Sequence, residues 1–134
     1  ETFSPIAMLK SVRTMLVIVT FYNYEIWQMG VKKMHSLMDF LYMMQPKGFV
    51  DSKGANKVCK LQRSIYGLVQ ASRSWNIRFD KVIKAYGFIQ TYGEARIYKK
   101  VSGSSVAFLI LYVDDILLIG NDIEFLNSIK SILE

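Results

Sequence analysis

Two adjacent aspartates, Asp114 and Asp115, are the residues of this sequence best suited to do chemistry. They stand between the apolar segments LILY and ILLIG, whose other side chains are suited to burial. Two carboxylates about 4 Å apart repel each other by about 4 kcal/mol at an effective dielectric constant near 20. A divalent cation removes this cost, because magnesium prefers carboxylate and phosphate oxygens. The pair therefore indicates either a metal site for phosphoryl chemistry or a solvent-exposed acidic turn, since aspartate also favours turns.

The elements that must position this pair follow from the hydrophobic pattern. Segments 107–112 and 116–119 predict a hairpin that is buried on both faces, with the aspartates at its turn. The clearest helix covers residues 72–86, where an apolar stripe recurs at helical spacing and Gly87 ends it. Further helices are predicted at 5–24, with Ser4 as N-cap, and at 122–134, and further strands at 25–31, 41–45, 58–61 and 96–101. The order predicts an α+β fold in which helices cover one face of a small antiparallel sheet.

Composition limits the class of protein. The 134 residues, 51% of them hydrophobic, suit one packed domain, and the single cysteine excludes an internal disulfide. No apolar run is long enough for a membrane span, and no signal peptide is evident, so we expect a protein that is neither secreted nor in a membrane. The net charge is +6, yet residues 47–84 alone carry nine Lys or Arg against two Asp. This block indicates either a polyanion partner such as nucleic acid or a solvated basic face.

Four further segments join the YVDD sequence of residues 112–115 in one pattern. The chain opens with ETFSP, continues with WQMGV at 27–31 and QPKGF at 45–49, and carries VCKLQRSIYGLVQASRSW at 58–75. In this order they resemble the ETFSPV, WQMDV, QPEGF and VCKLxKSLYGLKQAxRxW segments of copia-type LTR-retrotransposon reverse transcriptases. YVDD resembles motif C of that family, WQMGV its motif A and the last segment its motif B. The resemblance covers nearly the whole chain.

The resemblance implies a fingers-and-palm fold and RNA-directed DNA polymerase activity. Residues 1–134 would be one partial domain, truncated at both ends, of a Pol polyprotein that works in cytoplasmic particles or the nucleus. The partners would be an RNA template, a DNA primer and deoxynucleotides, and the cofactor Mg²⁺, or Mn²⁺. Asp114 and Asp115 would be the catalytic metal ligands. Nucleotide or template contacts would come from Gly67, Gln70, Arg73 and Tyr112, and contacts to the nucleic-acid backbone from Lys57, Lys60, Arg63 and Arg78.

One departure puts the activity in question. Gly30 stands where the family has the motif A aspartate, which binds both metals together with the motif C carboxylates. Glu25 is a poor substitute, because an odd offset on a strand places it on the opposite face. Asp39 lies beyond the altered segment, where sequence alone assigns it no geometry. His35 lies within that segment, at a position where the family has an aromatic residue, and a lone histidine there is a weak candidate for a metal ligand.

Two hypotheses remain, an active polymerase palm and a non-catalytic retroelement remnant that at most binds nucleic acid. Gly30 favours the remnant. An unrelated RNA-binding module would leave YVDD unexplained and shows no aromatic RNP-type pattern. We therefore expect this copy to be catalytically inactive.

Overall fold

The computed structural model describes residues 7–30, 41–62, 69–112 and 115–133, without the side chains of residues 41 and 69–72. The described elements, in chain order, are α1 (Leu9–Tyr22), β1 (Glu25–Gly30), β2 (Leu41–Met44), β3 (Val58–Leu61), α2 (Val69–Ala85), β4 (Ile89–Thr91), β5 (Glu94–Ser102), β6 (Ser105–Tyr112), β7 (Asp115–Gly120) and α3 (Ile123–Leu133). The predicted α+β class is confirmed.

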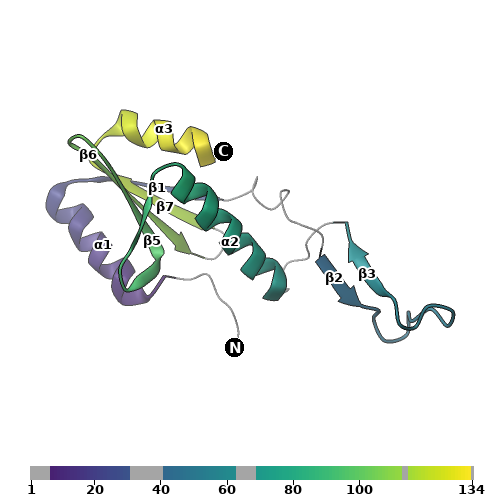
Figure 1. Cartoon of the computed structure of the whole chain (residues 1–134). Helices are drawn as coiled ribbons and strands as arrows, with labels where there is room; N and C mark the ends of the chain where they lie inside the picture. The colour runs from purple at the N-terminus through teal and green to yellow at the C-terminus, as the bar shows by residue number, and fades with distance from the viewer. Residues whose placement is uncertain (1–6, 31–40, 63–68, 113–114, 134) are drawn as a thin grey trace.

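A five-stranded antiparallel sheet forms the centre of the molecule, in the order β1-β7-β6-β5-β4 (Figure 1). Strands β5, β6 and β7 follow one another as a meander, and the predicted hairpin is its β6–β7 part. Strand β1 returns from early in the chain to pair with β7 over six residues. Strands β2 and β3 make a separate two-stranded sheet. Strand β4 was not predicted, because its three residues are too few to show a period of two.

Helices cover both faces of the main sheet, so the prediction of a single covered face is wrong. Helices α2 and α3 pack on one face through a cluster that includes Phe79 and Leu126, together with Leu109 and Leu118 of the hairpin. Helix α1 packs on the other face, where Met15 joins a second cluster containing strand residues Ile97, Ile110 and Ile119. Figure 1 shows α1 and α3 on opposite sides of the sheet. The physical reason is the hairpin itself, because its side chains from Val106 to Leu111 and from Ile116 to Ile119 are all apolar and leave neither face suited to water.

Helix α1 begins at Leu9, four residues later than predicted. Met8 is its extended N-cap residue, so Ser4, which lies outside the described residues, does not cap it. The preceding backbone is tied to the sheet instead, since Ala7 N donates to Leu111 O at 3.2 Å and Met8 N to Glu94 Oε2 at 3.0 Å. These bonds hold residues 7 and 8 beside the ends of β5 and β6, which delays the first helical turn.

The other helix ends follow the sequence signals. Gly87 has φ +85, and the bonds from Gly87 N to Lys84 O and from Phe88 N to Ile83 O complete a Schellman ending of α2. Asp122 caps α3, because its Oδ1 accepts a hydrogen bond from Phe125 N at 3.1 Å. No helix among the described residues is long and apolar enough to cross a membrane.

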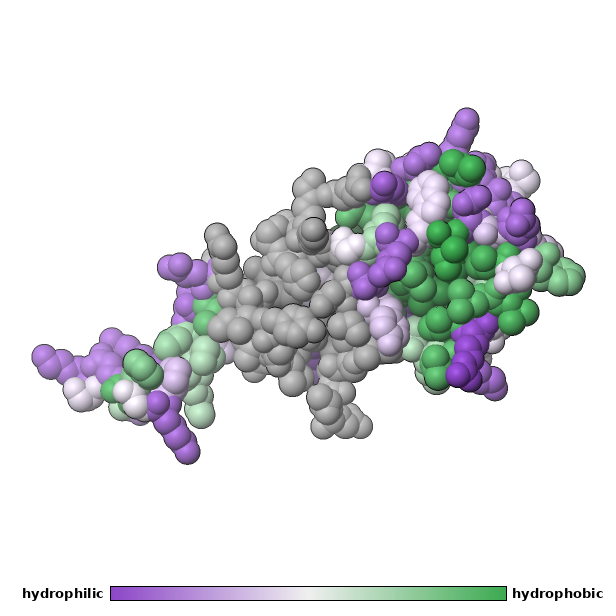
Figure 2. Space-filling model, turned by 180° about the vertical axis from the view of Figure 1, so that it is seen from behind, coloured by the Kyte–Doolittle hydropathy of each residue, from purple (hydrophilic) through white to green (hydrophobic). Residues whose placement is uncertain are grey.

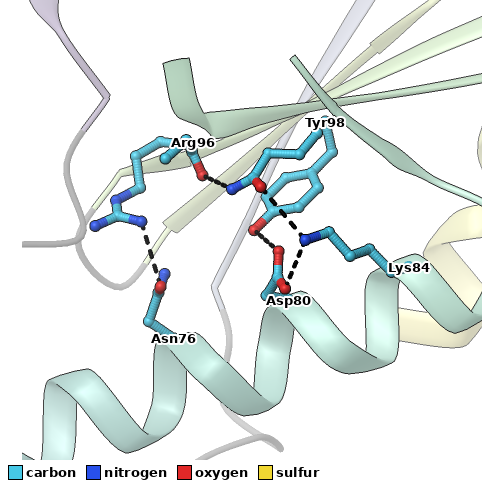
Figure 3. Close-up of polar contacts among 7 residues, drawn as sticks. Asn76, Asp80, Lys84, Arg96 and Tyr98 are labelled. Atoms are coloured by element: carbon cyan, nitrogen blue, oxygen red, sulfur yellow. Dashed lines mark hydrogen bonds and ion pairs between the residues drawn. The ribbon is translucent and has the colours of Figure 1, made fainter. Parts of the chain in front are cut away.

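A polar network fixes α2 over β5 (Figure 3). Asp80 accepts hydrogen bonds from the Tyr98 hydroxyl at 3.0 Å and from Lys84 Nζ at 2.8 Å. Asn76 Oδ1 accepts one from Arg96 Nη1 at 3.2 Å. Burial, and then the hydrogen bond to Asp80, raises the pKa of Tyr98 far above its ordinary value of 10.0, so this phenol stays protonated. The helix is thus held by directional bonds as well as by apolar packing.

Candidate active site

Asp115 is the first residue of β7 and lies between two other strands of the sheet. Its register partner on β1 is Gly30, and its partner on β6 is Tyr112. Directly opposed residues of an antiparallel pair point to the same face, so positions 30, 112 and 115 share one face. Asp114, the other motif C carboxylate, lies outside the described residues. The structure therefore brings the altered motif A position next to the acidic end of the hairpin.

Position 30 faces the Asp115 carboxylate and has room for a side chain. A Cβ built on Gly30 would lie 4.0 Å from Asp115 Oδ1, which is the nearest atom that the described residues outside its own chain neighbours present to it. This distance is an ordinary van der Waals contact. Within the described part of the chain, no contact requires a glycine at position 30, and β1 would accept an aspartate there without moving against β7.

The other Asp115 oxygen is held by a residue that the sequence motifs did not single out. Gln28 Nε2 donates a hydrogen bond to Asp115 Oδ2 at 3.2 Å. Gln28 precedes Gly30 by two positions on β1, so both face the same way. The sequence could have indicated Gln28 through its spacing of two from position 30, which places both residues on the same face of a strand. Only the pairing of β1 with β7 shows that this face meets Asp115.

The surroundings of Asp115 are open on one side and packed on the other. Tyr112 is 50% exposed, Gln28 and Gly30 are exposed, and Asp115 is half-buried. The next residue, Ile116, is buried in the cluster under α2 and α3. Alternation along β7 thus anchors the strand on one face and presents Asp115 to solvent on the other.

The described donor set does not fit a two-metal centre. No group of three or more His, Cys, Asp or Glu side chains able to hold a metal gathers among the described residues. Position 30 supplies no carboxylate, so Asp115 is the one acid of this strand pair that faces the site among the described residues. Glu25 pairs with Gly120 at the far end of β1, so it does not replace the missing acid. His35 and Asp39 lie outside the described residues.

The remaining predicted site residues come from other parts of the molecule. Arg73 and Arg78 lie on α2, which covers the sheet face opposite to Asp115. Lys57 and Lys60 lie in the β2–β3 ribbon, which comprises strands β2 and β3 and the loop between them (residues 41–61) and stands apart from the main sheet (Figure 1). Of Gln70 only the backbone, in α2, is described, and Arg63 and Gly67 lie outside the described residues. Among the predicted site residues that the structure describes, Tyr112, Gly30 and Asp115 are the ones that it brings together.

A family model described as Reverse transcriptase (RNA-dependent DNA polymerase) matches residues 1–134, the whole chain. The chain belongs to this reverse transcriptase family. It is 37% identical over 134 residues to the Retrovirus-related Pol polyprotein from transposon TNT 1-94 of Nicotiana tabacum, covering 97% of this chain and 10% of the relative. It is 35% identical over 131 residues to the corresponding polyprotein from transposon RE1 of Arabidopsis thaliana, covering 96% of this chain and 9% of that relative.

These relatives are Pol polyproteins of copia-type transposons, so the predicted family is confirmed. The chain spans about a tenth of the length of these relatives. No solved structure matches it. The described part of the candidate active site therefore consists of Gln28, Gly30, Tyr112 and Asp115.

Proposed function

We propose that this chain is a fingers-and-palm segment of a copia-type reverse transcriptase and that this copy does not polymerise. The five-stranded sheet corresponds to the palm and the β2–β3 ribbon to part of the fingers. The carrying observation is the register of β1 and β7, which sets Gly30 opposite Asp115. The position that lacks a carboxylate is thus the one that faces Asp115.

The chemistry of the parent family explains why this position matters. The proposed cofactor is Mg²⁺, or Mn²⁺, which supplies charge stabilisation at the attacking and leaving oxygens of a nucleotidyl transfer when carboxylates hold it. Position 30 of this chain contributes no ligand to such a site. Loss of one member of a catalytic unit typically reduces the rate by a factor of about 10⁴ or more. We therefore expect no measurable primer extension.

A graft tests this proposal. Residues 25–120 of this chain replace the matching segment of an active copia-type polymerase, with and without Gly30→Asp, and primer extension is measured with Mg²⁺ and with Mn²⁺. The unrepaired graft should be inactive. Gly30→Asp alone should recover little activity, because residues 33–36 also depart from the family pattern. Robust synthesis by the unrepaired graft would overturn the interpretation of Gly30.

A second function, non-specific binding of a nucleic-acid template or primer, is supported by the β2–β3 ribbon. Gln45 orders its loop, since Gln45 Nε2 donates to Gly54 O at 2.7 Å and to Lys57 O at 2.8 Å. Lysines 47, 53, 57 and 60 surround this loop, with Asp51 as the one acid between Leu41 and Gln62. Figure 2 shows the ribbon as an outlying unit whose hydrophilic and hydrophobic side chains both reach the surface. On α2, by contrast, Asp80 neutralises Lys84, so the basic block is not one uniform patch.

Salt titration tests the binding function. A labelled primer–template is titrated with the full chain at several salt concentrations, and log affinity should fall with log salt by about 0.9 per neutralised duplex phosphate. The double variant Lys57→Gln/Lys60→Gln should bind more weakly and with a shallower slope. Lys10→Gln/Lys99→Gln, which removes the same charge from exposed positions elsewhere, is the matched control. Affinity that does not respond to salt would contradict the idea.

A further inference from the structure

The two oxygens of the Asp115 carboxylate face different residues of β1. Oδ2 accepts the hydrogen bond from Gln28 Nε2 at 3.2 Å. Oδ1 is the atom that a Cβ at position 30 would approach, at 4.0 Å. Because Gln28 and Gly30 are successive residues on one face of β1, a single strand addresses both oxygens at once.

We propose that Gln28 is a positioning residue, which holds Asp115 by Oδ2 and thereby turns Oδ1 toward the motif A position. This inference rests on the proposed relation of Gly30 to the metal site of the parent family. Gln28 is not itself a catalytic residue, because its amide N–H donates a hydrogen bond to Asp115 and to no reacting atom.

The ladder around Gln28 makes such positioning effective. Strand β1 pairs with β7 from Glu25 to Gly30 without a register shift, so the backbone that carries Gln28 is fixed relative to Asp115. Gln28 lies opposite Leu117 and reaches diagonally to Asp115, a cross-strand offset that long side chains can span. A carboxylate at the end of a strand and open to solvent would otherwise rotate freely about its side-chain bonds.

The chemical type of residue 28 also suits this role. An amide donor is neutral, so it fixes the carboxylate without cancelling the charge that a cation would require. A lysine would supply a competing positive charge, and a glutamate would repel Asp115. Loss of a side chain that holds a metal ligand by a hydrogen bond typically lowers metal affinity 10- to 100-fold.

The first test concerns the hydrogen bond between Gln28 and Asp115 in the chain that keeps Gly30 and needs no metal. The side-chain amide signals of Gln28 are followed by NMR, and Asp115→Asn should shift them and accelerate their exchange with water. The side-chain amide of Gln62, an exposed glutamine after β3, is the internal reference and should not change. Gln28 signals that are insensitive to Asp115→Asn would overturn the inference, whatever the chain does with metals.

The second test concerns the consequence for a cation. Mn²⁺ binding is measured by electron paramagnetic resonance on the full chain with Gly30→Asp, then with Gln28→Met added, and with Gln62→Met added as control. Gln28→Met should weaken Mn²⁺ binding about tenfold, Gln62→Met should not, and both should leave the melting temperature similar. If Gln28→Met leaves Mn²⁺ binding unchanged, the inference about Gln28 is overturned and the proposed function is not affected. No binding by the Gly30→Asp chain contradicts instead the proposed role of position 30 as the missing metal-ligand position, and the NMR test then decides the role of Gln28.

Discussion

Replacing Gly30 with aspartate should destabilise the protein in the absence of metal and make its stability depend on divalent cations. The new carboxylate would extend from a Cβ that lies 4.0 Å from Asp115 Oδ1. The backbone would not need to move, because this distance is an ordinary contact. The effect should therefore be electrostatic rather than steric.

The loss of stability in Gly30→Asp follows from the separation of the two carboxylates and from their exposure to solvent. Two like charges about 4 Å apart repel by about 1 kcal/mol in water and about 4 kcal/mol at an effective dielectric constant of 20. Asp115 is half-buried at an open end of the sheet, so a loss of about 1–2 kcal/mol is expected. For a chain of 134 residues, each kcal/mol corresponds to a melting temperature change of about 3–5 °C. A cation at about 100 times its dissociation constant would return about 2.7 kcal/mol, more than the repulsion removes.

The assay is thermal unfolding at low ionic strength, where surface charges are least screened, with chelator and with millimolar Mg²⁺ or Mn²⁺. Gly30→Asn is the matched control, since it adds a side chain of the same size without the charge. Gly30→Asp should melt below Gly30→Asn in chelator and recover with metal, while Gly30→Asn and the unsubstituted chain should not respond to metal. Equal melting of the two variants in chelator would show that residue 30 does not face Asp115 and would refute the register argument.

Three further predictions concern the framework. Gly120→Ala should cost about 2–3 kcal/mol in urea unfolding, because its Cβ would lie 2.6 Å from Val106 O, whereas the Cβ of Gly30→Ala would come no nearer than 4.0 Å to the described residues around it. The pKa of Tyr98 is raised in the folded state, so stability should fall as the pH rises above the ordinary tyrosine value of 10.0, and Tyr98→Phe should lose this alkaline dependence. The pKa of Asp122 is lowered, chiefly by a hydrogen bond from Ser105, so its stabilisation should be present at neutral pH and decline as the pH falls below 3.8, a dependence that Asp122→Asn should abolish in acid unfolding curves.

Local signals predicted much of the fold. The helical period and Gly87 predicted an end of α2 at Tyr86, and the helix ends one residue earlier, at Ala85. The predicted apolar hairpin is present as β6 and β7. Helix α1 was less well predicted, because the bonds that hold Ala7 and Met8 to β6 and β5 come from residues distant in the chain. Likewise, the hairpin pattern showed that two faces are apolar but not which helix covers each.

The family motifs in the sequence alone determined the membership of this chain in the reverse transcriptases and the loss of an aspartate at Gly30. Those motifs are runs of residues close together in the chain, so they need no structure to be read. Only the tertiary structure decided that Gln28 touches Asp115, because the two lie 87 positions apart and meet through the pairing of β1 with β7. Several strands of this chain have similar apolar patterns, and which of them become neighbours, and in which register, depends on the packing of the whole sheet against its helices.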